Sequence, residues 1–286
     1  MKKTQIQIAV VAVIAIISAV LYYQPVKGLI KPKETRSAGG VASTDDHDHP
    51  AATVSVEQVS ETSKAAIGEA LAAKINDLEA KLKVTADDAG KLAIQKELAT
   101  QWDDVNQPGP AAFYYKDVAS KEGTADSWVK AGNRFNDAYK LTQDTTAQPT
   151  YLANAVEAFE TARKLAPDNL DVKTGLGVAY VNGGAPSPMQ GISLLLEVVK
   201  QDPNNRNANL NLGMFAMKSG QYDKAIGRFK TVIAQKAEVE PYFYLAESYK
   251  QLGQKKEAIE AYNKCKEMMP DPAFGQRIDE YIKELK

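Results

Sequence analysis

The sequence predicts an all-α protein built from helix pairs that stack along the chain. Between residues 92 and 272, small and large apolar residues recur in one order with a period of about 34 residues. Three of these segments carry a proline near their end, at a place where it would end a helix. A long apolar run over residues 6–23 precedes them and predicts a single membrane span.

The last segment, residues 239–272, carries the pattern most completely. Its positions 4, 7, 8, 11, 20, 24, 27 and 32 are Tyr242, Leu245, Ala246, Tyr249, Ala258, Tyr262, Cys265 and Pro270. In the three segments before it, position 8 is Gly132, Gly177 and Gly213. Glycine inside a helix costs roughly 1 kcal/mol relative to alanine, so its recurrence in one register indicates that another helix approaches closely there.

This pattern resembles the tetratricopeptide repeat. The resemblance implies a right-handed superhelical solenoid of antiparallel helix pairs, a fold that usually holds another protein. We assign the solenoid to residues 85–272, with units at about residues 92–124 (degenerate), 125–169, 170–205, 206–238 and 239–272. The unit at 125–169 contains eleven extra residues, which predict that both of its helices are longer around a polar loop. An apolar stripe predicts a capping helix over residues 273–286.

Residues 6–23 follow a tail of residues 1–5 and are predicted to form a transmembrane signal anchor. Eighteen helical residues span about 27 Å, close to the thickness of a hydrocarbon core. Lys2 and Lys3 precede the run, and Tyr22 and Tyr23 close it as an interfacial pair. The alternative is a cleaved secretion signal, but no small-residue cleavage site follows the run.

The orientation of this anchor rests on two opposing features. The short tail before the span favours export of the body, which would place the repeats in the periplasm on the inner membrane. Lys27, Lys31, Lys33 and Arg36 beyond the span favour the alternative, a cytoplasmic repeat domain. The single cysteine, Cys265, occupies a packing position and does not indicate a redox compartment.

Residues 24–58 are predicted to be a flexible linker and residues 59–84 an amphipathic helix. The linker contains an Asp-Asp-His-Asp-His run at residues 45–49, which lacks a second ligand group and does not predict a metal site. The helix carries Ile75, Leu78 and Leu82 on one face. Two alternatives follow: the helix packs on the first repeat, or it self-associates as a short coiled coil and makes a homo-oligomer.

Charge and residue types exclude several classes of function. The 35 basic and 36 acidic side chains nearly cancel, so no electrostatic feature predicts nucleic-acid binding. The repeats contain no histidine, and their one thiol is a packing residue, so the sequence predicts neither an enzyme nor a cofactor site.

The resemblance implies that positions 2, 5, 6, 9, 12 and 13 of each unit line a concave face that binds a protein or peptide. On this basis the candidate peptide groove comprises Asn133, Val178, Val181, Asn182, Asn207, Leu210, Asn211, Met214, Met217, Lys218, Phe243, Tyr244 and Glu247. Leu210, Met214 and Met217 form a second apolar stripe outside the core positions, and methionine suits adaptable binding surfaces. The alternatives are ordinary packing between units and burial under the N-terminal helix.

The sequence therefore predicts a membrane-anchored scaffold or adaptor that holds a partner segment in its concave groove. Its architecture resembles anchored repeat proteins that support envelope protein assembly or translocation. The alternative is a structural function instead of a binding function: an oligomer in which the helix at 59–84 self-associates and the repeats act as a rigid spacer.

Overall fold

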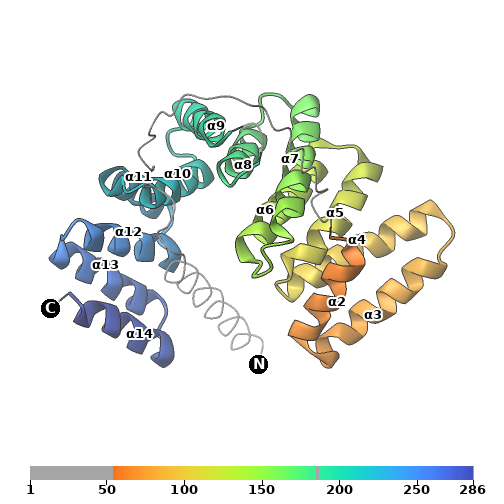
Figure 1. Ribbon diagram of the computed structural model, residues 1–286, viewed down its shortest axis with the longest axis horizontal. Coiled ribbons are helices and arrows are strands. Elements are labelled where there is room, and N and C mark those ends of the chain that lie inside the picture. Colours follow the sequence, from red (N-terminus) through yellow and green to blue (C-terminus); the bar gives the residue numbers. More distant parts are fainter. Residues whose placement is uncertain (1–53, 185–186, 286) are drawn as a thin grey trace, which may run out of the picture. The chain divides into compact units, whose positions relative to one another are not determined.

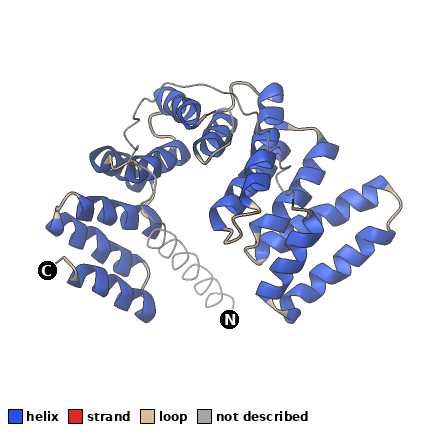
Figure 2. Cartoon of the chain, viewed as in Figure 1, coloured by secondary structure: helices blue, strands red, loops and turns tan. Residues whose placement is uncertain are grey.

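A computed structural model describes residues 54–184 and 187–285 of the chain. These residues belong to one compact unit, Thr53–Lys286, and within them there are thirteen helices and no strand (Figure 2). The predicted all-α class is confirmed. The predicted tail, the membrane span at 6–23 and nearly all of the linker lie outside the described residues. Within the described ranges, no helix has both the length and the apolar character that a membrane crossing requires.

The helices follow one another closely along the chain. Their bounds are α2 Val56–Ile67, α3 Glu69–Val84, α4 Asp88–Asp104, α5 Pro108–Glu122, α6 Ala125–Leu141, α7 Gln148–Leu165, α8 Leu170–Val181, α9 Pro188–Gln201, α10 Arg206–Lys218, α11 Tyr222–Gln235, α12 Val239–Gln251, α13 Lys255–Met268 and α14 Pro272–Lys283.

The helices pack as successive pairs, from α4 with α5 to α12 with α13 (Figure 1). The first helices of neighbouring pairs also contact each other, α6 with α8, α8 with α10 and α10 with α12. Each pair thus contacts mainly its neighbours, as in a solenoid, and α14 packs on α13 at the end. In the pair with the extra residues, α6 and α7 have 17 and 18 residues around the loop at 142–147.

Polar caps and prolines begin these helices. The side chain of Asn169 accepts hydrogen bonds from the backbone N–H groups of Asp171 and Val172 at the start of α8. Pro188 and Pro272 stand first in α9 and α14, where a missing N–H group leaves no hydrogen bond unmade. Gly220, with φ of 74°, follows α10 in a left-handed conformation that reverses the chain toward α11.

The small residues at position 8 lie where the sequence predicts close helix packing. An ideal Cβ atom on Gly213 would be 2.6 Å from the ring of Phe229, and one on Gly132 would be 2.7 Å from the ring of Phe159. On Gly177 it would be 2.9 Å from the carbonyl oxygen of Gly191 on α9. A methyl group does not fit at these distances, so the helices of each pair approach closely because these residues lack side chains.

The N-terminal helix differs from the prediction. The sequence analysis assigned one helix to residues 59–84, but the structure has two, because Gly68 with φ of 79° and ψ of 164° interrupts the helical backbone. The first of them, α2, begins at Val56, inside the predicted linker. The single unbroken helix predicted for residues 59–84 is therefore wrong.

The apolar face of α3 is buried within the same chain. Ile75 and Leu78 are 0% and 4% exposed and belong to a core cluster with Leu98 and Trp102 of α4. Helix α2 packs on α5. These contacts agree with the alternative in which this segment packs on the first repeat.

Candidate peptide-binding surface

The candidate residues come from the first helices of four successive pairs. Asn133 lies on α6; Val178 and Val181 lie on α8, with Asn182 as its C-cap; Asn207, Leu210, Asn211, Met214, Met217 and Lys218 lie on α10; Phe243, Tyr244 and Glu247 lie on α12. Contacts between α6, α8, α10 and α12 bring these helices side by side. The individual residues, however, differ widely in exposure.

Helix α10 carries an apolar stripe that its own core leaves open. Leu210, Met214 and Met217 are half-buried. The core positions of the same helix, Ala208, Leu212 and Phe215, are nearly fully buried, and a rotation of about 100° per residue places them on the opposite side. The stripe is therefore additional to the packing that holds α10 in place.

Polar groups border this stripe. Asn207 and Lys218 are exposed and Asn211 is half-buried. The Nδ2 group of Asn211 donates to the Asn207 carbonyl oxygen at 2.8 Å, while its Oδ1 atom has no hydrogen-bond partner among the described residues. The oxygen can therefore accept a hydrogen bond from a backbone N–H group of a bound peptide.

The two valines of α8 serve packing more than binding. Val178 and Val181 pack against the core cluster that contains Leu195 and Val198 of α9. Val181 also approaches Gly191, since a Cβ atom there would be 2.8 Å from the valine Cγ2. The side chains remain half-buried and only border the candidate surface.

Phe243 and Tyr244 were assigned to the groove, and the structure corrects this. They are 6% and 2% exposed. Phe243 lies 6.0 Å from the ring of Tyr262 and 5.8 Å from that of Tyr281 on α14, while Tyr244 stacks on Phe229 at 5.5 Å. Both residues are buried because neighbouring helices supply aromatic partners to each side of α12. A partner protein cannot reach them.

Glu247 is also engaged within the chain. It is half-buried, and its carboxylate accepts a hydrogen bond from the Tyr262 hydroxyl. Burial and this carboxylate together raise the pKa of Tyr262 well above its ordinary value. The contribution of α12 to the candidate surface is therefore small.

Two charged residues beside the candidate Lys218 were not among the candidates. Lys140 of α6 forms an ion pair with Glu240 of α12 at 3.6 Å. Although the Lys218 side chain keeps exposed surface, the protein atoms around its ammonium group lower its pKa, and the nearby positive charge of Lys140 lowers it further. No local pattern in the sequence reveals this pair, because α6 and α10 meet only through the stacking of α8 between them.

A buried hydrogen bond joins α6 to α8. The Nδ2 group of Asn136 donates to the Gly175 carbonyl oxygen at 3.0 Å. Beside it, burial raises the pKa of Asp137, although Arg134 forms an ion pair with it at 2.8 Å. Of these groups only Asn136 joins α6 to α8, since Arg134 and Asp137 both lie on α6. Among the described residues, no group of three or more His, Cys, Asp or Glu side chains is placed to hold a metal ion.

Comparisons with known proteins agree with this architecture. The family pattern described as tetratricopeptide repeat matches residues 239–272. A search of curated proteins found no match to the chain. Among solved structures, a tetratricopeptide repeat protein from Parabacteroides merdae is 15% identical, with a TM-score of 0.51, and the alignment covers 80% of this chain and 88% of that one.

Two further solved structures are similar at lower TM-scores. YrrB, described as a TPR protein with an unusual peptide-binding site, is 19% identical with a TM-score of 0.41, over 74% of this chain and 98% of that one. MamA is 18% identical with a TM-score of 0.42, over 64% and 93% of the two chains. The fold is thus that of a tetratricopeptide-type helical repeat, and its last unit, residues 239–272, matches the repeat itself. Such proteins generally serve as scaffolds that bind protein or peptide partners.

Proposed function

We propose that this tetratricopeptide-type repeat protein is a membrane-anchored scaffold that binds a peptide segment of a partner protein along α10. The observation that carries the proposal is the stripe of Leu210, Met214 and Met217. These side chains remain half-buried on a helix whose opposite face already fills the core. Unbranched, polarizable methionine side chains adapt to different apolar groups, which suits a binding surface.

The polar groups around the stripe define the partner further. Lys218 supplies positive charge at one end, next to Lys140, which is paired with Glu240, and the Oδ1 atom of Asn211 is free to accept a hydrogen bond. A matching segment presents apolar side chains to the stripe and an acidic group to the lysines. The same arrangement would disfavour basic segments at this end of α10.

The membrane part of the proposal rests on the apolar run at residues 6–23. An anchor there would hold the repeats near the bilayer and raise their local concentration toward membrane-bound partners, so a modest affinity would suffice. We place the repeats in the periplasm and the protein in envelope protein assembly or translocation. Protease added to intact cells and to spheroplasts tests the orientation: repeats protected in both would be cytoplasmic.

The binding surface is tested by photo-crosslinking in cells. A benzophenone amino acid at position 214 should crosslink a specific partner, and the same group at Met189 of α9, which is 71% exposed, serves as the control. Leu210→Glu should abolish the crosslink from position 214 while the helical circular dichroism signal is unchanged. If Leu210→Glu unfolds the protein, the stripe is core and the proposed surface is wrong.

A further inference from the structure

The helix pair α8–α9 is joined to the pair α10–α11 by a small contact. Helix α9 contacts α10 less extensively than α7 contacts α8 or α11 contacts α12. The side chains explain the difference: Phe159 of α7 packs against α8, and Phe229 of α11 stacks on an aromatic ring of α12 at 5.5 Å. The corresponding residue of α9, which packs against Gly177 of its own pair, is Leu195, and α9 has no aromatic residue. A joint with fewer buried apolar contacts opens at a lower free energy, so the solenoid bends most readily between α9 and α10.

An ion pair crosses this joint from one side of the solenoid to the other. The Nζ atom of Lys140 on α6 lies 3.6 Å from the Oε1 atom of Glu240, in the first turn of α12. Helix α6 precedes the α9–α10 joint in the chain and α12 follows it. The two helices meet because α6 has 17 residues, whereas α8 has 12 and α10 and α12 have 13 each. Lys140 stands in the last turn of this longer helix, so the extra residues of its unit are what bring the charge to α12.

The charges beside this ion pair are unevenly compensated. Lys140 has two carboxylates near it, those of Glu240 and Asp137. Lys218, at the end of α10, forms no ion pair with a described residue. The surrounding protein atoms lower the pKa of Lys218, and the charge of Lys140 lowers it further, with no carboxylate acting in the other direction. The two ammonium groups therefore repel each other across the joint, and an anion beside Lys218 would remove this repulsion.

On the basis of the function proposed above, we propose that the solenoid is a clamp that hinges between α9 and α10 and closes on an acidic segment of the partner. Val178 of α8 and Met214 of α10 lie on opposite sides of the hinge, so its angle sets the width of the candidate surface. The ion pair between Lys140 and Glu240 holds the closed arrangement, and the repulsion between Lys140 and Lys218 opposes it. A partner carboxylate at Lys218 cancels that repulsion, so binding and closure favour each other.

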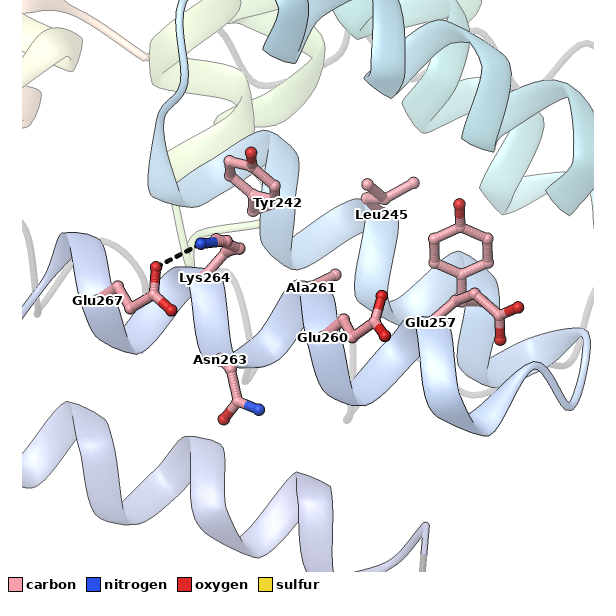
Figure 3. Close-up of a pocket in the computed structure, with 9 residues that line it drawn as sticks. Tyr242, Leu245, Glu257, Glu260, Ala261, Asn263, Lys264 and Glu267 are labelled. Carbon is pink, nitrogen blue, oxygen red and sulfur yellow. Dashed lines mark hydrogen bonds and ion pairs between the residues drawn. The ribbon is translucent and has the colours of Figure 1, made fainter.

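Double electron–electron resonance on the full-length protein in detergent tests the hinge without a partner. Spin labels at Gln143→Cys, in the loop after α6, and at Asn263→Cys on α13 report the distance between the two sides. Both positions are exposed. Figure 3 shows Asn263 pointing away from the cleft between α12 and α13, so a label there leaves the packing of these helices intact. Cys265 is buried and stays unlabelled.

Two single changes should move this distance in opposite directions. Glu240→Gln removes the attraction and should raise the population at longer distances, by at most about fivefold, as is typical for a partly exposed ion pair. Lys218→Gln removes the repulsion and should shift the population to shorter distances. Lys96→Gln is the control, because it breaks an ion pair of similar exposure between α4 and α5, and it should change nothing. An unchanged distance in Glu240→Gln, or the same shift in both variants, would overturn the clamp.

Exchanging the two charges separates electrostatic from steric effects. Lys140→Glu with Glu240→Lys keeps an ion pair across the joint in reversed order and should restore the short distances that Glu240→Gln loses. If the exchanged pair leaves the solenoid as open as Glu240→Gln does, the ion pair does not hold the closed form and that part of the proposal is wrong.

A synthetic peptide in which leucine alternates with glutamate tests the coupling to binding. At saturation, followed by fluorescence anisotropy, it should shift the wild-type protein to shorter distances and have no such effect on Lys218→Gln. The same peptide with glutamine in place of glutamate should leave the distance unchanged. Binding of the glutamate peptide without a shift would overturn closure but leave the surface along α10 intact. If the peptide does not bind while Glu240→Gln still opens the solenoid, the surface along α10 is wrong and only the hinge stands.

Discussion

The ring of Phe159 fills the space in which a side chain on Gly175 would begin. An ideal Cβ atom on Gly175 would lie 2.1 Å from the ring Cζ atom, and one on Gly132 would lie 2.7 Å from Cε2. Phe159 belongs to α7, so its ring packs against α6 of its own pair and against α8 of the next pair. One aromatic side chain thus joins two repeat units, and it does so because both neighbouring helices carry glycine.

Gly175→Ala should lower the free energy of unfolding. Overpacking a core costs about 1–3 kcal/mol, which exceeds or cancels the gain of roughly 1 kcal/mol from replacing a helical glycine. Gly227→Ala on α11 is the control, since no atom lies within 4 Å of its Cβ position, and it should stabilise by about 0.5–1 kcal/mol. Urea denaturation followed by circular dichroism compares the two. Equal stabilisation by both would show that the Phe159 ring moves aside freely.

Asn209→Ala should destabilise the pair formed by α10 and α11. Asn209 is fully buried, and its Nδ2 group donates to the carbonyl oxygens of Pro203 and Asn205 at 2.9 Å each. Its Oδ1 atom accepts a hydrogen bond from Arg228 at 2.9 Å. Leaving such groups without partners costs about 1–3 kcal/mol.

Asn211→Ala, on the same helix but half-buried, is the matched control for this change. It should alter the urea midpoint by much less than Asn209→Ala does. A similar small shift for both variants would mean that water replaces the hydrogen bonds of Asn209 without penalty.

Cys265 should remain unreactive in the native protein at neutral and mildly alkaline pH. Burial raises the pKa of its thiol to about 12, whereas the same thiol titrates near 9 in an unperturbed setting. Between these values the unfolded chain loses the proton and the native chain keeps it, so native stability falls as pH rises above about 9. Thiol labelling with iodoacetamide at pH 8 should be slow in buffer and complete in urea. Rapid labelling in buffer would contradict the buried placement.

Ile75→Ala should cost about 2–5 kcal/mol, because it removes a fully buried side chain from the core between α3 and α4. Leu71→Ala on the same helix should cost little, since Leu71 is 56% exposed. Thermal denaturation measures the loss of stability in both variants. If α3 instead joined copies of the chain, Leu71→Ala would lower the particle mass in light scattering at equal protein concentration, and such a change would contradict the packing of this helix within its own chain.

The spacing of small and large residues was enough to predict the helix pairs. Gly132, Gly177 and Gly213 mark the contact between the two helices of a pair, and in each case the partner of that contact follows in the next helix of the sequence. The stripe on α10 was likewise recognisable, because its residues differ in register from the core positions. The break at Gly68 was missed because a helix can tolerate a single glycine in its interior, so a lone glycine in a helical pattern does not by itself predict a break.

The tertiary structure alone decided which apolar residues stay accessible. Leu210 and Phe243 both stand at position 5 of their units, yet Phe243 is buried because α14 brings Tyr281 against it, whereas Leu210 stays half-buried. The proximity of Lys140 to Lys218 likewise depends on helices from different units. Periodicity determines how a helix packs against its sequence neighbour, whereas exposure depends on every helix that surrounds it, and those contacts arise only when the units stack.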